Sequence, residues 1–408
     1  MQNTYQRYPL NGIHIGVKKE KIKSSTWLLA LYLFLAPLDF LPVIPGVSLS
    51  RILIFLPLVG CLFYMKDTKI HLDRFFVVPI LYVMMVTVTM FYSYDVLVTK
   101  QRTISIGFNI AAILVLSMFS YNKRELGKIK KAMVYSGWFI LLLMTFYSNI
   151  SLMDARLIVV VNGAFQDPNY LCGFLIFTII YYFEEFMQKR KKSAFVIMCV
   201  FIVFVLLTGS RGGLVATLGS ILFYAVIWIK HKRFNFSSII KLLSLIFLLS
   251  IFFNIALDIL PASVAQRYDT SFTLTDEGAG RWHIWESILY NYKASTEFNK
   301  LFGWGAGTIR YFTYSGDVGH NIWIESLMEI GIIGVVILLI FYLTYFKKAC
   351  KMHEYIAAAS FVGYMIMTMS LSLCSYKPIW NVILLIMLLK NGKHEVGNNA
   401  SKDHQSRI

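Results

Sequence analysis

The chain has 408 residues and a formal net charge of +17, and 57% of its residues are hydrophobic while only 15% are charged. Soluble domains carry about 25% charged residues, so this composition excludes an ordinary soluble protein. The positive charge does not indicate nucleic-acid binding, because the sequence contains no basic groove pattern with interleaved stacking aromatic residues.

The apolar residues form blocks of roughly 17–25 residues, the length that a helix needs to cross a bilayer core of about 30 Å. We count twelve, at about 26–45, 49–65, 75–93, 104–121, 130–148, 169–187, 193–209, 212–229, 238–257, 321–346, 355–373 and 377–391. The sequence predicts an all-α polytopic membrane protein with about twelve transmembrane helices. The first block does not read as a cleaved signal peptide, because eleven more follow it.

Basic residues gather at the N-terminus and in alternate loops, which places both termini in the cytoplasm by the positive-inside rule. We therefore expect one integral membrane domain at 26–391, with cytoplasmic tails at 1–25 and 392–408. Two links on the predicted outer face are long, namely 149–168 and 258–320, and long loops are usually functional or carry their own structure.

Within the second long loop, the segment from Arg281 to Leu289 has helical spacing. Arg281, Trp285 and Ile288 fall on one face, together with Leu289. This pattern predicts an amphipathic helix that lies on the outer membrane surface.

The predicted outer face is also rich in arginine, whereas the inner loops are dominated by lysine. A guanidinium group binds phosphate through two parallel hydrogen bonds and keeps its charge when it is partly buried. The pattern favours binding of phosphate or pyrophosphate, and the alternative is that few outer lysines are tolerated. The seven outer arginines are Arg51, Arg102, Arg156, Arg211, Arg267, Arg281 and Arg310.

Arg211 stands between two apolar runs, after Ser210 and before two glycines. An arginine at a membrane boundary is a functional candidate. Ser210 and the glycines would let an anionic headgroup approach the amino end of the following helix, where free N–H groups favour anions. The alternative is a tight hairpin whose arginine extends to the interface.

His320 precedes the tenth apolar block and is followed by Asn321, Glu325 and Glu329. Histidine is the side chain best suited to accept a proton near neutral pH, and a nearby carboxylate could orient its ring. A capping or interfacial histidine is the alternative. His283 is a rival in the same loop, but its neighbours Trp282 and Trp285 fit a membrane anchor equally well.

Asp167 precedes Pro168 at the start of the sixth block and fits a helix cap, with a site-lining role as the lesser alternative. No nucleotide-binding motif is found, and none of the five cysteines lies in the long outer loop, so neither a disulfide framework nor a zinc site is indicated.

The order of these motifs resembles the O-antigen ligase/polymerase superfamily, which contains the Wzy-type polymerases and related ligases of bacterial surface polysaccharide assembly. The resemblance covers about 160–345 by motif. The matching elements are Ser210-Arg211-Gly212-Gly213, the outer loop with Arg281 and Trp285, Gly303-x-Gly305-x-Gly307, His320-Asn321 and Glu329-x-Gly331-x-x-Gly334.

The resemblance implies a glycosyltransferase whose donor is a glycan on undecaprenyl diphosphate, at the outer face of the bacterial cytoplasmic membrane. His320 would be the catalytic base, and Arg211 and Arg281 would bind the diphosphate, with Arg267 as a looser match. Ser210, Asn321 and Glu329 would support the site. We expect no metal or cofactor, inversion at the anomeric carbon, and a chain-length regulator as a candidate partner.

Three alternatives stay open. A ligase would transfer the glycan to a lipid, protein or wall acceptor by the same donor chemistry. A flippase or transporter would call for charged residues at mid-bilayer depth and short outer loops, whereas the charges here collect at the predicted outer boundary. A purely structural or sensory membrane protein is the third.

Overall fold

The computed structural model describes residues 22–44, 47–63, 74–151, 156–231, 236–372 and 376–389. Apart from residues 22–25, the two predicted tails lie outside these residues, as does Cys374.

Each of the twelve predicted apolar blocks contains one to three helical elements. The amino-terminal half contains α1 (Ser24–Leu35), the 3₁₀ turn η1 (Ala36–Phe40), α2 (Leu49–Leu53), α3 (Phe55–Leu62), η3 (Arg74–Phe76), α4 (Val77–Val88), η4 (Thr89–Phe91), α5 (Val96–Ser117), α6 (Lys123–Phe146), α7 (Pro168–Lys189) and α8 (Lys192–Leu207).

The second half begins with α9 (Arg211–His231) and α10 (Phe236–Ile259) and ends with α15 (Ile322–Lys351), α16 (Tyr355–Met367) and a helix at Lys377–Leu389. The predicted long loop contains four short or medium helices and a 3₁₀ turn. These are α11 (Ala262–Gln266), α12 (Thr270–Thr275), α13 (Arg281–Ala294), α14 (Glu297–Phe302) and η5 (Ile309–Phe312).

Five of the described helices are long and apolar enough to cross a membrane, namely α6, α7, α9, α10 and α15. Six further apolar helical segments span 10–17 residues, and α5, with 22 residues, falls in neither group. The protein is therefore a mostly helical, multi-pass membrane protein, and the count of twelve spans stays a prediction.

Two small antiparallel sheets were not predicted. The first pairs β1 (Pro42–Ile44) with β2 (Val47–Ser48). The second has the order β3-β4-β5, from strands Ser148–Ser151, Arg156–Val161 and Ala164–Gln166, so it occupies the first long loop. Asp167 follows β5 directly, and its side chain accepts a hydrogen bond from the amide of Asn169, which caps α7 as expected.

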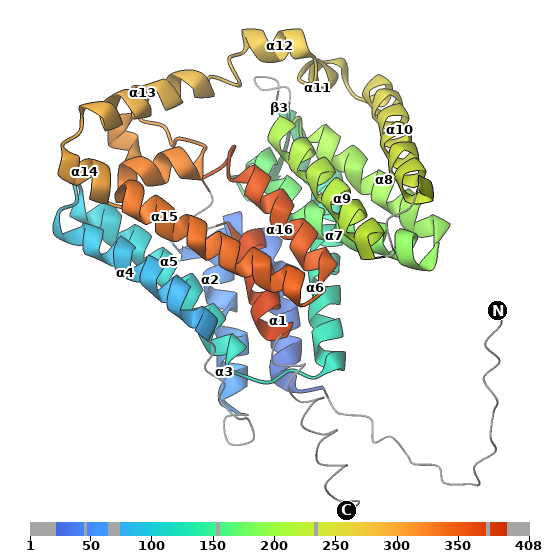
Figure 1. The fold of residues 1–408 in the computed structure, drawn as a ribbon, viewed down its shortest axis with the longest axis horizontal. Coiled ribbons are helices and arrows are strands. Elements are labelled where there is room, and N and C mark those ends of the chain that lie inside the picture. The colour runs from blue at the N-terminus through green and yellow to red at the C-terminus, as the bar shows by residue number, and fades with distance from the viewer. Residues whose placement is uncertain are drawn as a thin grey trace, which may run out of the picture.

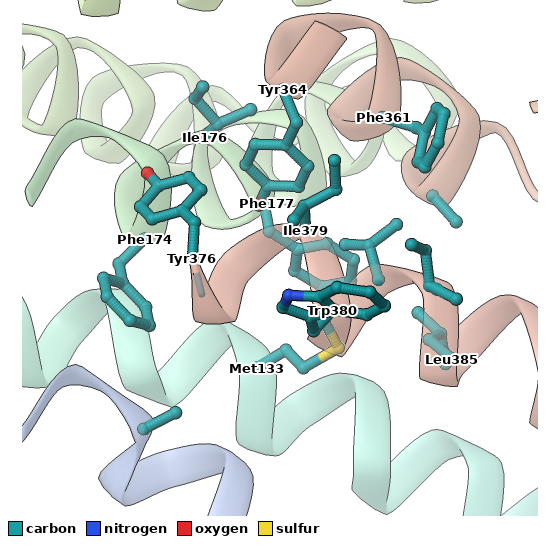
Figure 2. Close-up of a cluster of buried hydrophobic side chains, with 14 of the residues drawn as sticks. Met133, Phe174, Ile176, Phe177, Phe361, Tyr364, Tyr376, Ile379, Trp380 and Leu385 are labelled. Atoms are coloured by element: carbon teal, nitrogen blue, oxygen red, sulfur yellow. The ribbon is translucent and has the colours of Figure 1, made fainter. Parts of the chain in front are cut away.

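The core lies where α6, α7, α16 and the helix Lys377–Leu389 meet, and Figure 2 shows part of it. Tyr364 and Tyr376 are both buried there beside α7. A glycine allows this approach, because a Cβ atom on Gly173 would stand 1.3 Å from the hydroxyl oxygen of Tyr376. The Tyr364 hydroxyl donates to the Gly173 carbonyl at 3.1 Å, so its polar end is satisfied inside the core.

The loop helices form an arch over one end of the bundle, as the gold and orange segments of Figure 1 show. The predicted helix at Arg281–Leu289 is confirmed as part of α13. Its Ile288 is buried against Ile309 and Met328. The indole N–H of Trp285 donates to the carbonyl of Gly319 at 2.8 Å, which holds α13 to the segment before α15. Trp282 and Tyr290 remain exposed on α13.

Candidate functional site

Four arginines from distant parts of the chain converge at the end of the bundle beneath the arch. The positive charges of three of them act on the fourth, Arg281. They come from the start of β4, the start of α9, the end of α11 and the start of α13. We call this group the arginine cluster, and its members are Arg156, Arg211, Arg267 and Arg281.

Gly209 makes the close packing of this cluster possible. Its φ of 62° lies in the left-handed region, and a Cβ atom there would stand 2.9 Å from Cδ of Arg267 and 3.3 Å from Cγ of Arg156. The Nε of Arg267 donates to the Gly209 carbonyl at 3.1 Å. The turn between α8 and α9 therefore fits between two guanidinium side chains.

Arg211 is paired with Asp276, which follows α12 in the arch. The Nη2 atom of Arg211 lies 2.9 Å from Oδ2 of Asp276, and both side chains are about one-fifth exposed. Partial burial opposes ionisation of this carboxyl, but the hydrogen bonds from Arg211 outweigh it and hold the pKa of Asp276 below its ordinary value. This ion pair connects the arch to α9.

Two members of the cluster retain unused hydrogen-bonding capacity within the described part of the chain. The Nε atom of Arg156 is buried and has no hydrogen-bond partner. Arg281 is half-buried and forms no hydrogen bond or ion pair with any described residue. Burial and the other three arginines lower the pKa of Arg281 from its ordinary value. Because buried charges are costly unless they are paired, this arrangement fits a ligand with several negative charges.

Ser210 joins the start of α9 to the start of α7. Its buried hydroxyl donates to Oδ1 of Asn169 at 2.6 Å and accepts from the amide of Gly213 at 3.0 Å. The same Asn169 oxygen accepts from Nη2 of Arg156 at 2.9 Å. Ser210 is thus connected to Arg156 through Asn169.

His320 lies beside the cluster. Its backbone is left-handed, with a φ of 49°, and its side chain is half-buried. Burial and the nearby charge of Arg281 lower the pKa of His320 below the ordinary histidine value, and Asp167 opposes this shift. The ring forms no hydrogen bond to any residue that the structure describes. The lowered pKa favours the neutral imidazole, which is the form that can accept a proton.

Asn321 and Glu329 hold the surrounding backbone. The Asn321 side chain caps α15 by accepting from the amides of Trp323 and Ile324. The amide of Ile309 donates to a carboxylate oxygen of Glu329 at 3.3 Å, so Glu329 lies against the 303–309 turn. The carboxylates that act on His320 include Asp167 and Asp317, and no described contact joins Glu329 to the histidine.

The glycines of the Gly303-x-Gly305-x-Gly307 motif serve backbone packing. A Cβ atom on Gly303 would stand 2.3 Å from the carbonyl carbon of Glu329. On the opposite side, a Cβ atom on Gly331 would stand 2.3 Å from the Leu301 carbonyl oxygen, and the φ of Gly331 is 67°. The turn and the start of α15 are thus fixed against each other, which sets the direction in which the segment before α15 enters the site.

His283, the rival base, lies in a different environment. Its side chain is 68% exposed and contacts the carboxylate of Glu277. Two residues of the site were not singled out from the sequence as its members. Arg156 was one of seven outer arginines, and Asp167 was interpreted mainly as a helix cap. Both lie in the first long loop, 149–168, and that position was the available indication.

The fold and this site define a multi-pass membrane protein with an arginine cluster and a neighbouring histidine at one end of its helical bundle. The family model described as O-antigen ligase matches residues 193–339, from α8 to α15. The match supports the O-antigen ligase/polymerase superfamily for this region, which contains Arg211, Arg267, Arg281 and His320 but not Arg156, Asp167 or Asn169. The family supports glycan transfer of the ligase or polymerase type. No curated protein matches the chain.

Proposed function

We propose that the protein is a polysaccharide polymerase, which transfers a glycan from undecaprenyl diphosphate to a hydroxyl of a second lipid-linked repeat unit. The observation that carries the proposal is the meeting of a neutral His320 with four arginines, two of which retain unused hydrogen-bonding capacity among the described residues. A diphosphate supplies the charges that this cluster lacks, and a histidine beside it supplies the base.

The donor lipid also has a matching surface. An apolar cavity of about 310 Å³ opens between α8, α9 and α10, lined by Leu214, Leu218 and Phe253 among others. Leu214 lies one helical turn from Arg211, so a lipid tail in this groove would bring its diphosphate to the arginine cluster. The groove would keep the tail in contact with the bilayer.

In the reaction, a nitrogen of His320 takes the proton from the acceptor hydroxyl while that oxygen attacks the anomeric carbon. The bond between this carbon and the diphosphate oxygen breaks, and undecaprenyl diphosphate leaves with the electron pair. The arginines stabilise the charge that develops on the leaving oxygen. Asp167 stabilises the imidazolium form of His320. Attack from the face opposite the leaving group inverts the anomeric configuration.

Ligase activity is the second candidate, because the matching family is described as O-antigen ligase. The two candidates share the donor and differ in the acceptor. Deletion of the gene should remove lipid-linked polymer if the protein is a polymerase. Deletion should cause such polymer to accumulate if it is a ligase.

The direct test supplies purified protein in lipid nanodiscs with lipid-diphosphate repeat units and without nucleotide, metal or any regulator protein. Longer lipid-linked products are expected. His320→Ala should abolish them, and Arg281→Lys should reduce them strongly because a point charge does not reproduce the planar fork. His283→Ala and Arg310→Lys, at exposed positions, are the matched controls.

Equal product lengths for His320→Ala and the wild type would contradict the role of the histidine. Cysteine labelling from outside intact cells at positions 276 and 317, both in the arch region, tests the predicted outer location. Labelling from the cytoplasmic side only would contradict it.

A further inference from the structure

A second polar region lies away from the arginine cluster, between η1, α2, α5 and the helix Lys377–Leu389. It consists of two cavities of about 260 Å³ each, which share Asp39, Phe40 and Lys377 in their linings. The first is lined further by Arg51, Ser105 and Asn109 among others. The second is lined further by Gln166, Asp167 and Tyr170 among others. We call the two together the polar cleft.

Lys377 is the most unusual residue of the cleft. Its side chain is 3% exposed, and its ammonium group donates to the neutral amide oxygen of Asn109 at 2.9 Å. No described carboxylate lies within 4.0 Å of it. Asp39, the acid that shares the cleft, accepts hydrogen bonds from the hydroxyls of Ser48 and Ser50. A buried ammonium group without an ion partner is costly, so the cleft favours an anionic ligand.

A second buried lysine shows that burial alone does not create such a site. Lys348 is 4% exposed, and its ammonium group lies 4.4 Å from the centroid of the Phe75 ring and 3.1 Å from Sδ of Met387. The aromatic face and the sulfur stabilise its charge by direct contact. Lys377 instead lines two cavities large enough for a ligand group.

The cleft reaches the candidate catalytic residues at Asp167. This carboxylate lines the second cavity, and its charge acts on both His320 and Arg281. A ligand that fills the cleft would therefore end at Asp167, whose charge acts on the base. The rings of Phe40, Phe165 and Tyr170 also line the cavities, together with hydroxyl and amide groups, and such a lining suits sugars.

We propose that the polar cleft binds the acceptor glycan, and that Lys377 and Arg51 bind an anionic group which this acceptor carries. The inference rests on the proposed function and adds where the acceptor lies and what chemistry it has. The anionic group is either the carboxylate of an acidic sugar or the diphosphate of the acceptor lipid.

The test compares Lys377→Met with Lys348→Met, which removes a buried lysine outside the cleft. Two probes separate the sources of negative charge: the repeat-unit oligosaccharide released from its lipid by mild acid, and farnesyl diphosphate. Each is titrated by thermal stabilisation against purified protein that carries Arg281→Gln, a change that weakens diphosphate binding at the arginine cluster. In this background, Lys348→Met should leave the binding of one probe unchanged, and Lys377→Met should weaken it about tenfold to a hundredfold.

If binding of the oligosaccharide depends on Lys377, the anionic group is the carboxylate of an acidic sugar. If binding of farnesyl diphosphate depends on Lys377, the anionic group is the diphosphate of the acceptor lipid. Equal binding of both probes to the two variants overturns the inference. If Lys377→Met does not fold, as judged by gel filtration, Arg51→Met takes its place with the same expectation. Probe binding that depends on Lys377 in a protein without transfer activity would overturn the proposed function and leave the anion site standing.

Discussion

The two successive helices α9 and α10 are both long and strongly apolar, but they differ in their surroundings. Half of the apolar window of α9 is buried inside the protein, compared with 17% for α10. In Figure 1, α10 lies at the edge of the bundle, while α9 lies against α16. Both helices are strongly apolar, so hydropathy does not explain the difference.

Small residues explain it. A Cβ atom on Gly212 would stand 2.4 Å from the hydroxyl of Ser370, and one on Gly219 would stand 2.4 Å from Cδ1 of Ile366. Helices associate in lipid through such close packing. In contrast, α10 presents large exposed side chains such as Phe247 and Leu248. One side of the lipid groove is thus fixed and carries Arg211, and the other side is open to the bilayer.

The largest effect is expected from a bulky residue on the fixed side. A Cβ atom on Gly213 would already stand 2.5 Å from Sγ of Cys172, so Gly213→Leu should displace the start of α9 and Arg211 with it. We expect a loss of transfer of about 100-fold or more, together with about 1–3 kcal/mol of stability. Leu248→Ala on α10 should stay close to the wild type both in transfer, measured in nanodiscs, and in thermal stability. Similar losses in the two variants would contradict the difference between the helices.

The next largest effect on transfer is expected from substitution of the arginines on the two sides of the lipid groove. Arg211 starts the fixed helix and makes a forked contact with Asp276, whereas Arg267 follows α11 on the open side. Because lysine does not reproduce the fork, Arg211→Lys should reduce transfer about 10- to 100-fold. Arg267→Lys should cost less, since Arg267 matches the family motifs more loosely than Arg211 does. The ratio of kcat/KM values measures this, and the reverse order would contradict it.

A smaller effect concerns pH. Transfer requires neutral His320, so activity should rise as pH increases through the lowered pKa of this histidine. Arg281→Gln removes a positive charge that lowers this pKa, so the acid limb of the profile should move to higher pH. Asp167→Asn removes an opposing negative charge, so the limb should move to lower pH. Rates measured across pH 4–8 test this, and shifts in the same direction would contradict it.

The smallest effect is expected in the groove. Leu218→Trp on α9 would fill part of the space between α9 and α10, and it should weaken the use of undecaprenyl donors by a few-fold. Transfer from a donor with a short lipid should be as fast in this variant as in the wild type. Leu243→Trp, at an exposed position of α10 that does not line the groove, is the control. An equal loss of transfer from donors with long and short lipids would contradict binding of the lipid tail in this groove.

Much of the fold follows from the sequence, because long apolar blocks in a membrane protein must form helices that satisfy their own backbone groups. The small sheets were missed, since strands such as Val47–Ser48 are too short to show a period. The capped start of α7 was predicted, because Asp167 and Pro168 form a local motif.

The site was predictable only in part. His320, Arg211 and Arg281 stand in recognisable motifs, and the structure places their charges near one another. The position of Arg156 in the site depends on how a small sheet packs against the turn at Gly209, and no local sequence pattern encodes that contact. Lys377 was missed because a lysine before Pro378 at the start of an apolar block resembles an ordinary interfacial residue.

The left-handed backbone of His320 has a consequence for how this protein could change. A side chain other than glycine or asparagine in this conformation costs about 1 kcal/mol. His320→Gly would relieve that cost and raise the melting temperature while removing the imidazole. Selection for stability alone would therefore favour replacement of His320. Retention of the histidine would require continued selection for catalytic activity.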